Sequence, residues 1–350
     1  MNSFATTIAL SVVFACSIGA RAVIAQNPQP VEDPTPIAVS ELIERVRSSN
    51  HDQETISRAL GVGNILLKAT RYSEAVELFK ALAENQSQNP MVIYGYALAT
   101  FNTGKAAEAE LLAQRAVDLA NKITDVDRSQ RTADVLVLLA VIRAVLNNDS
   151  GALKALQQAL TLVPSHFDAQ FSLGRLLFGM GDDSGAISAF RAATKLQPAN
   201  PQALFFLATT FERSGDAENA LIAYRKLVNL RPDISEGHLG VGVLLVKRGG
   251  SATAEGLKEL LRALEINPNL YEARVALGRA LIGSGKALEA VDHLLRAAQL
   301  APGNPEPHYQ LSLAYRRLGR KEEAAAQALI VKRIHESRRN LKVNKQSRVG

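Results

Sequence analysis

A Gly-Lys pair within GRALIGSGKA, residues 278–287, is the part of the sequence most similar to a catalytic motif. A phosphate-binding loop needs a glycine before four spacer residues and Ser or Thr after the lysine, because backbone amides and the hydroxyl hold the phosphates and their magnesium ion. Ala280 and Ala287 occupy these two positions, and the segment lies between two predicted helices instead of following a strand. We therefore interpret Gly285 and Lys286 as a helix–turn–helix connection.

The other residue types used in catalysis or metal binding are scattered. No set of nucleophile, base and orienting residue stands out. The one cysteine, Cys16, lies near the N-terminus, so the rest of the chain offers no thiolate for a disulfide or a metal. The six histidines show no metal-site spacing, and we interpret them as isolated surface or half-buried residues: His51, His166, His238, His293, His308 and His335. The sequence therefore predicts a protein that is not an enzyme and uses no cofactor or metal.

A repeated pattern fills most of the chain. LGRLLFGMGDDSGAISAFRAATKLQP, residues 173–198, is followed by LATTFERSGDAENALIAYRKLVNLRP, residues 207–232. Charged residues differ freely between these copies, while leucine, glycine, alanine, aromatic and proline positions recur, as at Pro198 and Pro232. Further copies occur upstream and downstream, so the period marks a repeating structural unit.

Each copy predicts two amphipathic helices, because apolar residues recur at i, i+3, i+4 and i+7 on both sides of a glycine-containing turn. The turn glycines suit the left-handed conformation that ends many helices, and the prolines end the second helix. Small residues are expected where two helix backbones approach closely, with larger residues such as Phe190 beside them. These small residues are Gly174, Ala208, Gly242 and Gly278 on first helices, and Ala186, Ala220 and Ala290 on second helices.

This pattern resembles the tetratricopeptide repeat, in which Leu-Gly, Tyr, Ala, Phe and Pro recur over 34 residues. The resemblance covers roughly residues 56–338 and implies an all-α, right-handed superhelical solenoid of antiparallel helix pairs. Longer spacings around residues 121–132 and 249–256 are where we expect the solenoid to bend or break. Eight units are predicted to start near Ile56, Pro90, Ala133, Phe167, Pro201, Ser235, Tyr271 and Pro305.

The segments outside the repeats are assigned from composition. Residues 1–25 contain an apolar stretch followed by small residues, which predicts a signal peptide cleaved after Ala25 and an exported protein, periplasmic or secreted. An uncleaved membrane anchor is the alternative, since no Lys or Arg precedes the apolar stretch. Residues 26–39 are predicted to form a Pro-rich linker, residues 40–55 a capping helix and residues 339–350 a basic tail.

The net charge of +6 arises at the C-terminal end of the chain. Residues 332–350 hold seven Lys or Arg and one Glu, so the repeats themselves are nearly neutral. Such a segment can contact anionic lipid or another polyanion, although a solvated helix end is the commoner case. No specific nucleic acid and no small-molecule substrate are predicted.

In tetratricopeptide proteins, first helices line a concave surface that usually binds peptides or partner helices. In this sequence, cations alternate with apolar and aromatic side chains on that face, which favours an acidic and apolar protein or peptide partner. In the alternative interpretation, the aromatics only pack between units and the cations pair with Asp168, Glu236 and Glu272. The candidate groove residues are Phe171, Arg175, Phe178, Phe205, Arg213, Leu239, Lys247, Arg279, Ile282, Tyr309 and Arg317.

Two specialised versions of the family do not fit. The Lys and Asn clamp of cochaperones is matched by Asn64 in one position, but Leu60 and Gly95 occupy others. The asparagine ladder of the sugar-transferase relatives is missing, because its positions hold Gly61, Gly95, Leu138, Ser172, Phe206, Gly240, Ala276 and Gln310. We predict a scaffold or adaptor in envelope or secretory-compartment assembly. The alternatives are a membrane- or polyanion-associated subunit and an accessory subunit of a glycosyltransferase-type system.

Overall fold

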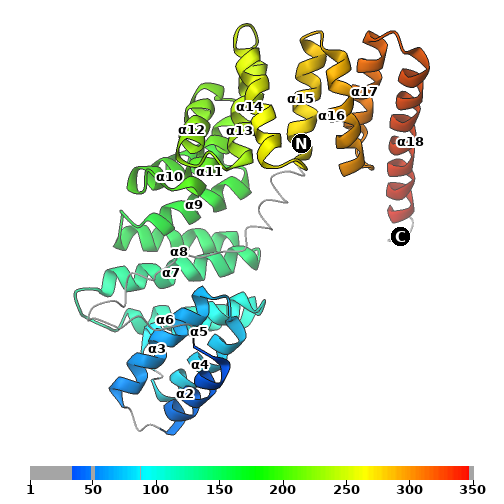
Figure 1. Ribbon diagram of the computed structural model, residues 1–350. Coiled ribbons are helices and arrows are strands. Elements are labelled where there is room, and N and C mark those ends of the chain that lie inside the picture. Colours follow the sequence, from blue (N-terminus) through cyan, green and yellow to red (C-terminus); the bar gives the residue numbers. More distant parts are fainter. Residues whose placement is uncertain (1–33, 49–51, 87, 347–350) are drawn as a thin grey trace. The chain divides into compact units, whose positions relative to one another are not determined.

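The computed structural model describes residues 34–48, 52–86 and 88–346 (Figure 1). This part of the chain forms seventeen α-helices, α2 to α18, and no strand. The predicted signal peptide and its cleavage point lie outside the described residues. The helices are α2 Pro36–Ser48, α3 Gln53–Lys68, α4 Tyr72–Asn85, α5 Pro90–Asn102, α6 Ala106–Ala120, α7 Arg128–Val145, α8 Asp149–Leu162, α9 Phe167–Met180, α10 Asp183–Leu196, α11 Pro201–Arg213, α12 Ala217–Leu230, α13 Ser235–Arg248, α14 Ala252–Ile266, α15 Tyr271–Gly283, α16 Ala287–Leu300, α17 Pro305–Arg317 and α18 Lys321–Gln346.

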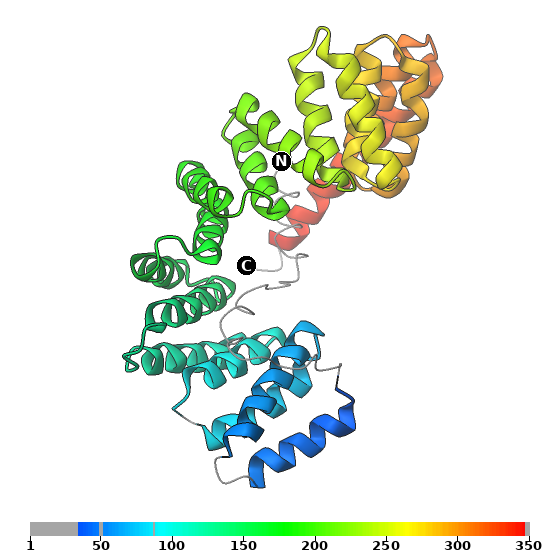
Figure 2. The same ribbon diagram turned by 60° about the vertical axis from the view of Figure 1, so that its left-hand side comes forward.

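Consecutive helices pack as pairs, from α3/α4 to α17/α18, which makes the protein an all-α solenoid. The chain divides into two compact units, unit 1 at residues 1–197 and unit 2 at residues 198–350. Within each unit, the second helix of one pair also packs on the first helix of the next pair, as Figure 2 shows for α12 to α17. Each pair therefore buries its apolar surface against its neighbours in the chain.

In unit 1, two groups of buried side chains follow the helices in order. One joins α2 to α5, and the other continues through α5 to α9 across the long spacing before α7. Residues 132–142 of α7 are all buried, which explains the apolar run that they contain. A break around residues 121–132 is therefore excluded, because α6 and α7 share one continuous core, whereas a bend there stays a prediction.

In unit 2, one buried group extends from α13 to α18 and includes residues of both α13 and α14. A break at residues 249–256 is therefore also excluded, and a bend there stays a prediction. Gly249 and Gly250 both have positive φ, and their turn absorbs the longer spacing before α14 begins at Ala252. The division of the chain instead falls at Gln197, between α10 and α11.

Several helix ends differ from the sequence prediction. The helix α2 begins at Pro36 within the predicted linker, because proline is well suited to the first turn of a helix. Helix α7 begins at Arg128, five residues before the predicted start at Ala133, so part of the insertion is helical. Helix α18 continues to Gln346 through most of the predicted tail. Six predicted starts are the first residues of helices: Pro90, Phe167, Pro201, Ser235, Tyr271 and Pro305.

Turn and cap residues account for the regular helix ends. Gly181, Gly215 and Gly285 have φ of 83°, 85° and 78°, which confirms the predicted left-handed turn positions. Asn89 and Asn200 cap α5 and α11 with their side chains, and a proline follows each of them. None of the described helices combines the length and the apolar character needed to cross a membrane.

Candidate functional site

The candidates of unit 1 lie on the first helix α9. Phe171, Arg175 and Phe178 are spaced i, i+4 and i+7, so they share one face, and all three are partly exposed. The Phe171 ring stacks on Phe167 with 5.8 Å between centroids, and it lies 5.8 Å from the ring of Phe190 on α10. Phe171 therefore helps to pack the α9/α10 pair and leaves only part of its ring accessible.

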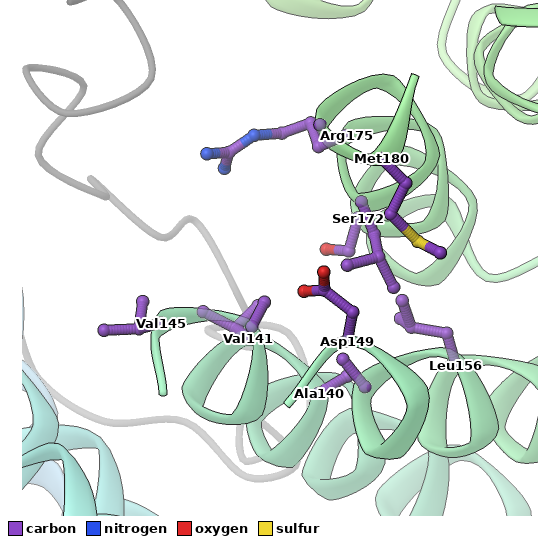
Figure 3. Close-up of a pocket in the computed structure, with 12 residues that line it drawn as sticks. Ala140, Val141, Val145, Asp149, Leu156, Ser172, Arg175 and Met180 are labelled. Carbon is purple, nitrogen blue, oxygen red and sulfur yellow. The ribbon is translucent and has the colours of Figure 1, made fainter. Parts of the chain in front are cut away.

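A pocket of about 320 Å³ opens between α7, α8 and α9 (Figure 3). The carboxylate of Asp149 on α8 points toward Ser172 on α9, whereas the Arg175 side chain extends away from that carboxylate (Figure 3). Apart from Asp149, Ser172 and Arg175, the lining of the pocket is apolar. It consists of Ala140, Val141, Ala144, Val145, Ala152, Leu156, Leu176, Gly179 and Met180.

A buried polar cluster holds the start of α9 against α7. His166 caps α9 by accepting the Ala169 amide at Nδ1 over 3.3 Å, so its Nε2–H donates to the Asp134 carboxylate of α7 over 2.8 Å. Gln130 also donates to Asp134, at 3.1 Å. Burial raises the pKa of neighbouring Asp168. The cluster connects two first helices, and its hydrogen bonds indicate a structural role.

His166 and His238 correct the interpretation of the histidines as isolated surface or half-buried residues. His238 of α13 is buried, with Nδ1 2.6 Å from a Glu259 carboxylate oxygen of α14 and Nε2 3.2 Å from the Pro232 carbonyl oxygen. A carbonyl oxygen only accepts, so the Nε2–H donates to Pro232. Both histidines therefore join neighbouring helices, and the sequence pattern alone did not indicate these partners.

In unit 2, the aromatic candidate Phe205 also packs within its own helix pair. Its ring lies edge-on to Tyr224 of α12, with 6.4 Å between centroids. The Tyr224 hydroxyl donates to Glu212 of α11 over 3.0 Å, and burial followed by the Glu212 charge raises the pKa of Tyr224. Burial also raises the pKa of Glu212. The carboxylate and the phenol thus hold α11 against α12 beside the partly exposed Phe205.

The candidates on α13, α15 and α17 differ in accessibility. Leu239 and Ile282 are only 9% and 4% exposed and belong to the apolar interior of unit 2, so neither offers a surface to a ligand. Tyr309 is 51% exposed. Arg317 donates to the carbonyl oxygen of Ile282 at the end of α15, which satisfies a terminal helix carbonyl.

Exposed cations remain on the same helices. Arg213, Lys247 and Arg279 are exposed on α11, α13 and α15. Lys247 and Arg279 form no ion pair within 4 Å in the part of the chain that the structure describes. The nearby charge of Lys247 opposes the upward pKa shift of Glu212. Neither Lys247 nor Arg279 forms the predicted ion pair with Glu236 or Glu272 among the described residues.

A row of carboxylates, missed as a feature by the sequence reasoning, occupies the second residue of α13, α15 and α17. Its members are Glu236, Glu272 and Glu306, all partly buried. Burial, and then the charge of Glu236, raises the pKa of Glu272. Burial and the charges of Glu306 and Glu272 raise the pKa of Tyr271 to about 12. The recurrence of Glu at the second helix residue was the signal in the sequence.

We call the exposed side of α11, α13, α15 and α17, with its cations and its carboxylate row, the first-helix face of unit 2. Among the described residues, this face combines exposed cations, partly buried carboxylates, the exposed Tyr309 and the partly exposed Phe205. Among residues 34–48, 52–86 and 88–346, no three His, Cys, Asp or Glu side chains are grouped to hold a metal ion.

Comparison with known proteins identifies the repeat. The sequence model of the family described as Tetratricopeptide repeat matches residues 61–122, 138–201, 172–236 and 275–335. No curated protein matches the chain.

Similar solved structures share the fold. The C-terminal part of a TPR repeat-containing protein from Cytophaga hutchinsonii is 16% identical over 72% of this chain and 99% of that chain, with a TM-score of 0.56. PilF of Pseudomonas aeruginosa is 18% identical over 59% of this chain and 94% of that chain, with a TM-score of 0.51. YrrB, described as a TPR protein with an unusual peptide-binding site, is 19% identical over 55% of this chain and 99% of that chain, with a TM-score of 0.45.

Proposed function

Because the chain belongs to the tetratricopeptide repeat family, we propose that it is a non-enzymatic scaffold whose first helices bind segments of partner proteins. The observation that carries the proposal is the first-helix face of unit 2. Lys247 and Arg279 are exposed there without ion-pair partners among the described residues, and Tyr309 on α17 is exposed as well. Like charges on one face repel each other, and an anionic group on a partner removes that cost through charge-assisted hydrogen bonds.

Tyr309 and the partly exposed Phe205 supply apolar contact area on this face, as aromatic residues do at many interfaces. The carboxylate row adds a second requirement, because an anionic partner segment must keep its charges away from Glu236, Glu272 and Glu306. The partner is therefore an acidic and apolar segment whose carboxylates face the cations at the far end of the first helices. Uniformly anionic segments fit less well, since part of their charge would face the carboxylate row.

The test is a double charge reversal, Lys247→Glu with Arg279→Glu. Partners are first identified by crosslinking the protein in its host and mass spectrometry, and binding of the purified partner is then measured. We expect binding at least about tenfold weaker, with the larger loss at low salt and unchanged helix content. The matched control is Lys226→Glu with Lys258→Glu, two exposed lysines on the second helices α12 and α14. Undiminished binding by the first variant would show that this face is not the binding surface.

We also propose that the scaffold acts after export, in an envelope or secretory-compartment assembly. The support is the sequence of residues 1–25, which lie outside the described residues. The measured mass of the exported protein should correspond to a chain whose first residue is Gln26 or lies within a few residues of it. A mature protein that retains Met1 would instead support the membrane-anchor alternative.

A second candidate function rests on α18. This helix has 26 residues, against 14 for α16, and its described C-terminal side chains, including Arg333 and Arg339, are exposed. A basic helix of this kind can bind an anionic membrane or polyanion. Truncation after Val331 separates the two functions, because only this second one predicts lost localisation together with intact partner capture.

A further inference from the structure

The pocket between α7, α8 and α9 interrupts the pattern of the first-helix residues. Val141 lies 34 residues before Arg175, so α7 carries valine at the repeat position where α9 carries a cation. One turn further along α7, Val145 is 56% exposed, and Met180 at the end of α9 is 49% exposed. Both side chains line the pocket, and a concave site with accessible apolar side chains is a common place for a ligand or partner group to bind. The pocket is therefore a mainly apolar recess whose lining also includes Asp149 and Arg175.

The small residues of the lining create the space. Ala140 and Ala144 on α7, Ala152 on α8 and Gly179 on α9 all line the pocket, and a Cβ atom added at Gly179 would meet nothing within 4 Å. A cavity of about 150 Å³ already accommodates a benzene molecule. The pocket, at about 320 Å³, has room for one large aliphatic side chain with its adjoining backbone. Met180 adds an unbranched side chain that adapts to different shapes.

The two charges of the lining give the pocket a polarity. Asp149 lies in the first turn of α8, and its carboxylate points toward α9 (Figure 3). Arg175 extends away from it (Figure 3). An apolar side chain between them would have an anionic group of the protein on one side and a cationic group on the other. A partner segment should bind most tightly when a cationic residue stands on one side of its apolar residue and an anionic residue on the other.

We propose that this pocket anchors one Leu, Ile or Met side chain of a partner segment, flanked by a basic residue near Asp149 and an acidic residue near Arg175. The proposal rests on the proposed scaffold function and adds an anchor residue to it. It differs from the contacts of the first-helix face of unit 2, which are mainly charged.

The chain provides a direct reporter, because its only methionines are Met1, Met91 and Met180. Met180 lines the pocket, whereas Met91 on α5 is partly buried against the core of unit 1. The full chain, labelled with ¹³C at the methionine methyl groups, is titrated with the peptide acetyl-Lys-Ala-Leu-Ala-Glu-amide and with the reversed sequence. We expect one of them to shift the Met180 signal and leave Met91 unchanged. The peptides with Ala in place of Leu should bind at least about tenfold more weakly.

Filling the pocket provides the matched variant. Gly179→Phe adds a ring at a residue of the lining where an added Cβ meets open space, and it should abolish the Met180 response to the Leu peptide. Gly61→Phe makes the same change on α3, where an added Cβ also meets nothing within 4 Å, and should leave the response intact. Asp149→Asn should weaken the favoured peptide and reduce the difference between the two peptide orders.

Each outcome decides the proposal. Three results would overturn it. The Met180 signal does not shift with either Leu peptide, it shifts equally with the Ala peptides, or it still shifts in the Gly179→Phe variant. If Gly179→Phe leaves binding of the natural partner intact while the Lys247 and Arg279 reversal removes it, the anchor is wrong and the scaffold function stands. If neither variant affects partner binding, both proposals fail.

Discussion

Helical glycines of this protein occupy positions of two kinds. At Gly256 of α14, an added Cβ would lie 2.9 Å from the Gly242 carbonyl oxygen and 2.9 Å from the Val246 amide nitrogen. Both are backbone atoms of α13, so neither can move aside as a flexible side chain would. At Gly61 of α3, the same atom would meet nothing within 4 Å. The repeat pattern identified Gly242 as a close-approach residue, but it could not show that backbone faces backbone at this position.

The effect of alanine should therefore have opposite signs at these two glycines. Gly256→Ala forces α13 and α14 apart and should lower the free energy of unfolding by about 1 to 3 kcal/mol. Gly61→Ala should raise it by about 0.5 to 1 kcal/mol, because alanine favours the helix. Urea denaturation followed by circular dichroism measures both changes. Equal stability of the two variants would contradict the close backbone contact.

Glu272 provides a second prediction at the residue scale. Burial and the nearby Glu236 charge raise its pKa above the usual 4.5, so the folded protein favours the protonated form. The folded protein is therefore more stable with Glu272 protonated than with Glu272 charged. This difference is fully present below the usual pKa and is lost as the pH rises through the raised pKa. Glu272→Gln should therefore raise the melting temperature at pH 7 by roughly 1 to 3 °C and have little effect near pH 4. Glu265→Gln, at an exposed residue paired with Arg262 over 2.8 Å, should give no such gain.

At the scale of the element, α2 is held to the solenoid at both of its ends. Arg71, just before α4, donates to the Pro34 carbonyl ahead of α2 and forms a bidentate pair with Glu74 over 2.7 and 2.6 Å. Asn85, the last residue of α4, donates to the Val46 carbonyl near the end of α2. The two helices therefore run in the same direction. Helix α2 thus covers the apolar side of the first pair, as a capping helix should.

Removing the Arg71 side chain should release the start of α2. Arg71→Ala breaks the bond to Pro34, and we expect amide hydrogen exchange in residues 36–48 to rise about fivefold to tenfold, measured by mass spectrometry. Arg47→Ala removes an exposed pair with Glu44 on α2 itself and should change exchange little. Unchanged protection of α2 in the Arg71 variant would mean that the bond to Pro34 does not hold this helix and that apolar packing and the Asn85 bond suffice.

Helix starts were predictable from sequence where local signals agree, and less so elsewhere. Pro90 and Pro201 follow capping asparagines, so the first helical residue is marked twice. No such signal marks Arg128, because the Asp127 side chain forms no cap and the buried residues of α7 begin only at Thr132. The C-terminal helix ended later than expected, since basic residues are compatible with continued helix and no breaker follows Val331.

At the scale of the whole molecule, the repeat period predicted the solenoid, but spacing did not predict where the chain divides. Both long spacings are absorbed by local changes, an extended α7 and a two-glycine turn, and the cores continue past them. The sequence predicted which residues lie on first helices. It could not separate Ile282 and Leu239, which are buried, from exposed Arg279, because both kinds of residue recur with helical spacing. The pocket of unit 1 depends on three helices together, so no local pattern revealed it.

Nearest-neighbour packing gives the last prediction. Deleting residues 235–270 removes α13, α14 and the turn that follows, so that α12 must pack against α15. Gly237 of α13 lies close to Val228 of α12, with 3.0 Å from an added Cβ to a Val228 methyl carbon. Ala273, at the corresponding position of α15, is larger than Gly237 by its Cβ atom. The new interface is therefore slightly overfilled but similar in shape, and the shortened protein should fold with the same helix content per residue.

Deleting only residues 235–251 removes α13 and leaves α14 unpaired. Leu260, Ala263 and Leu264, which are buried in the intact protein, would then lose the first helix of their pair. We expect this variant to lose cooperative unfolding in unit 2. The variant that lacks residues 235–270 should keep it, with a denaturant slope lower than that of the intact protein by roughly a tenth. Urea titrations followed by circular dichroism compare the two. If both deletions unfold alike, the repeating unit does not begin at Ser235, and the helix pair is not the element that transmits stability along the chain.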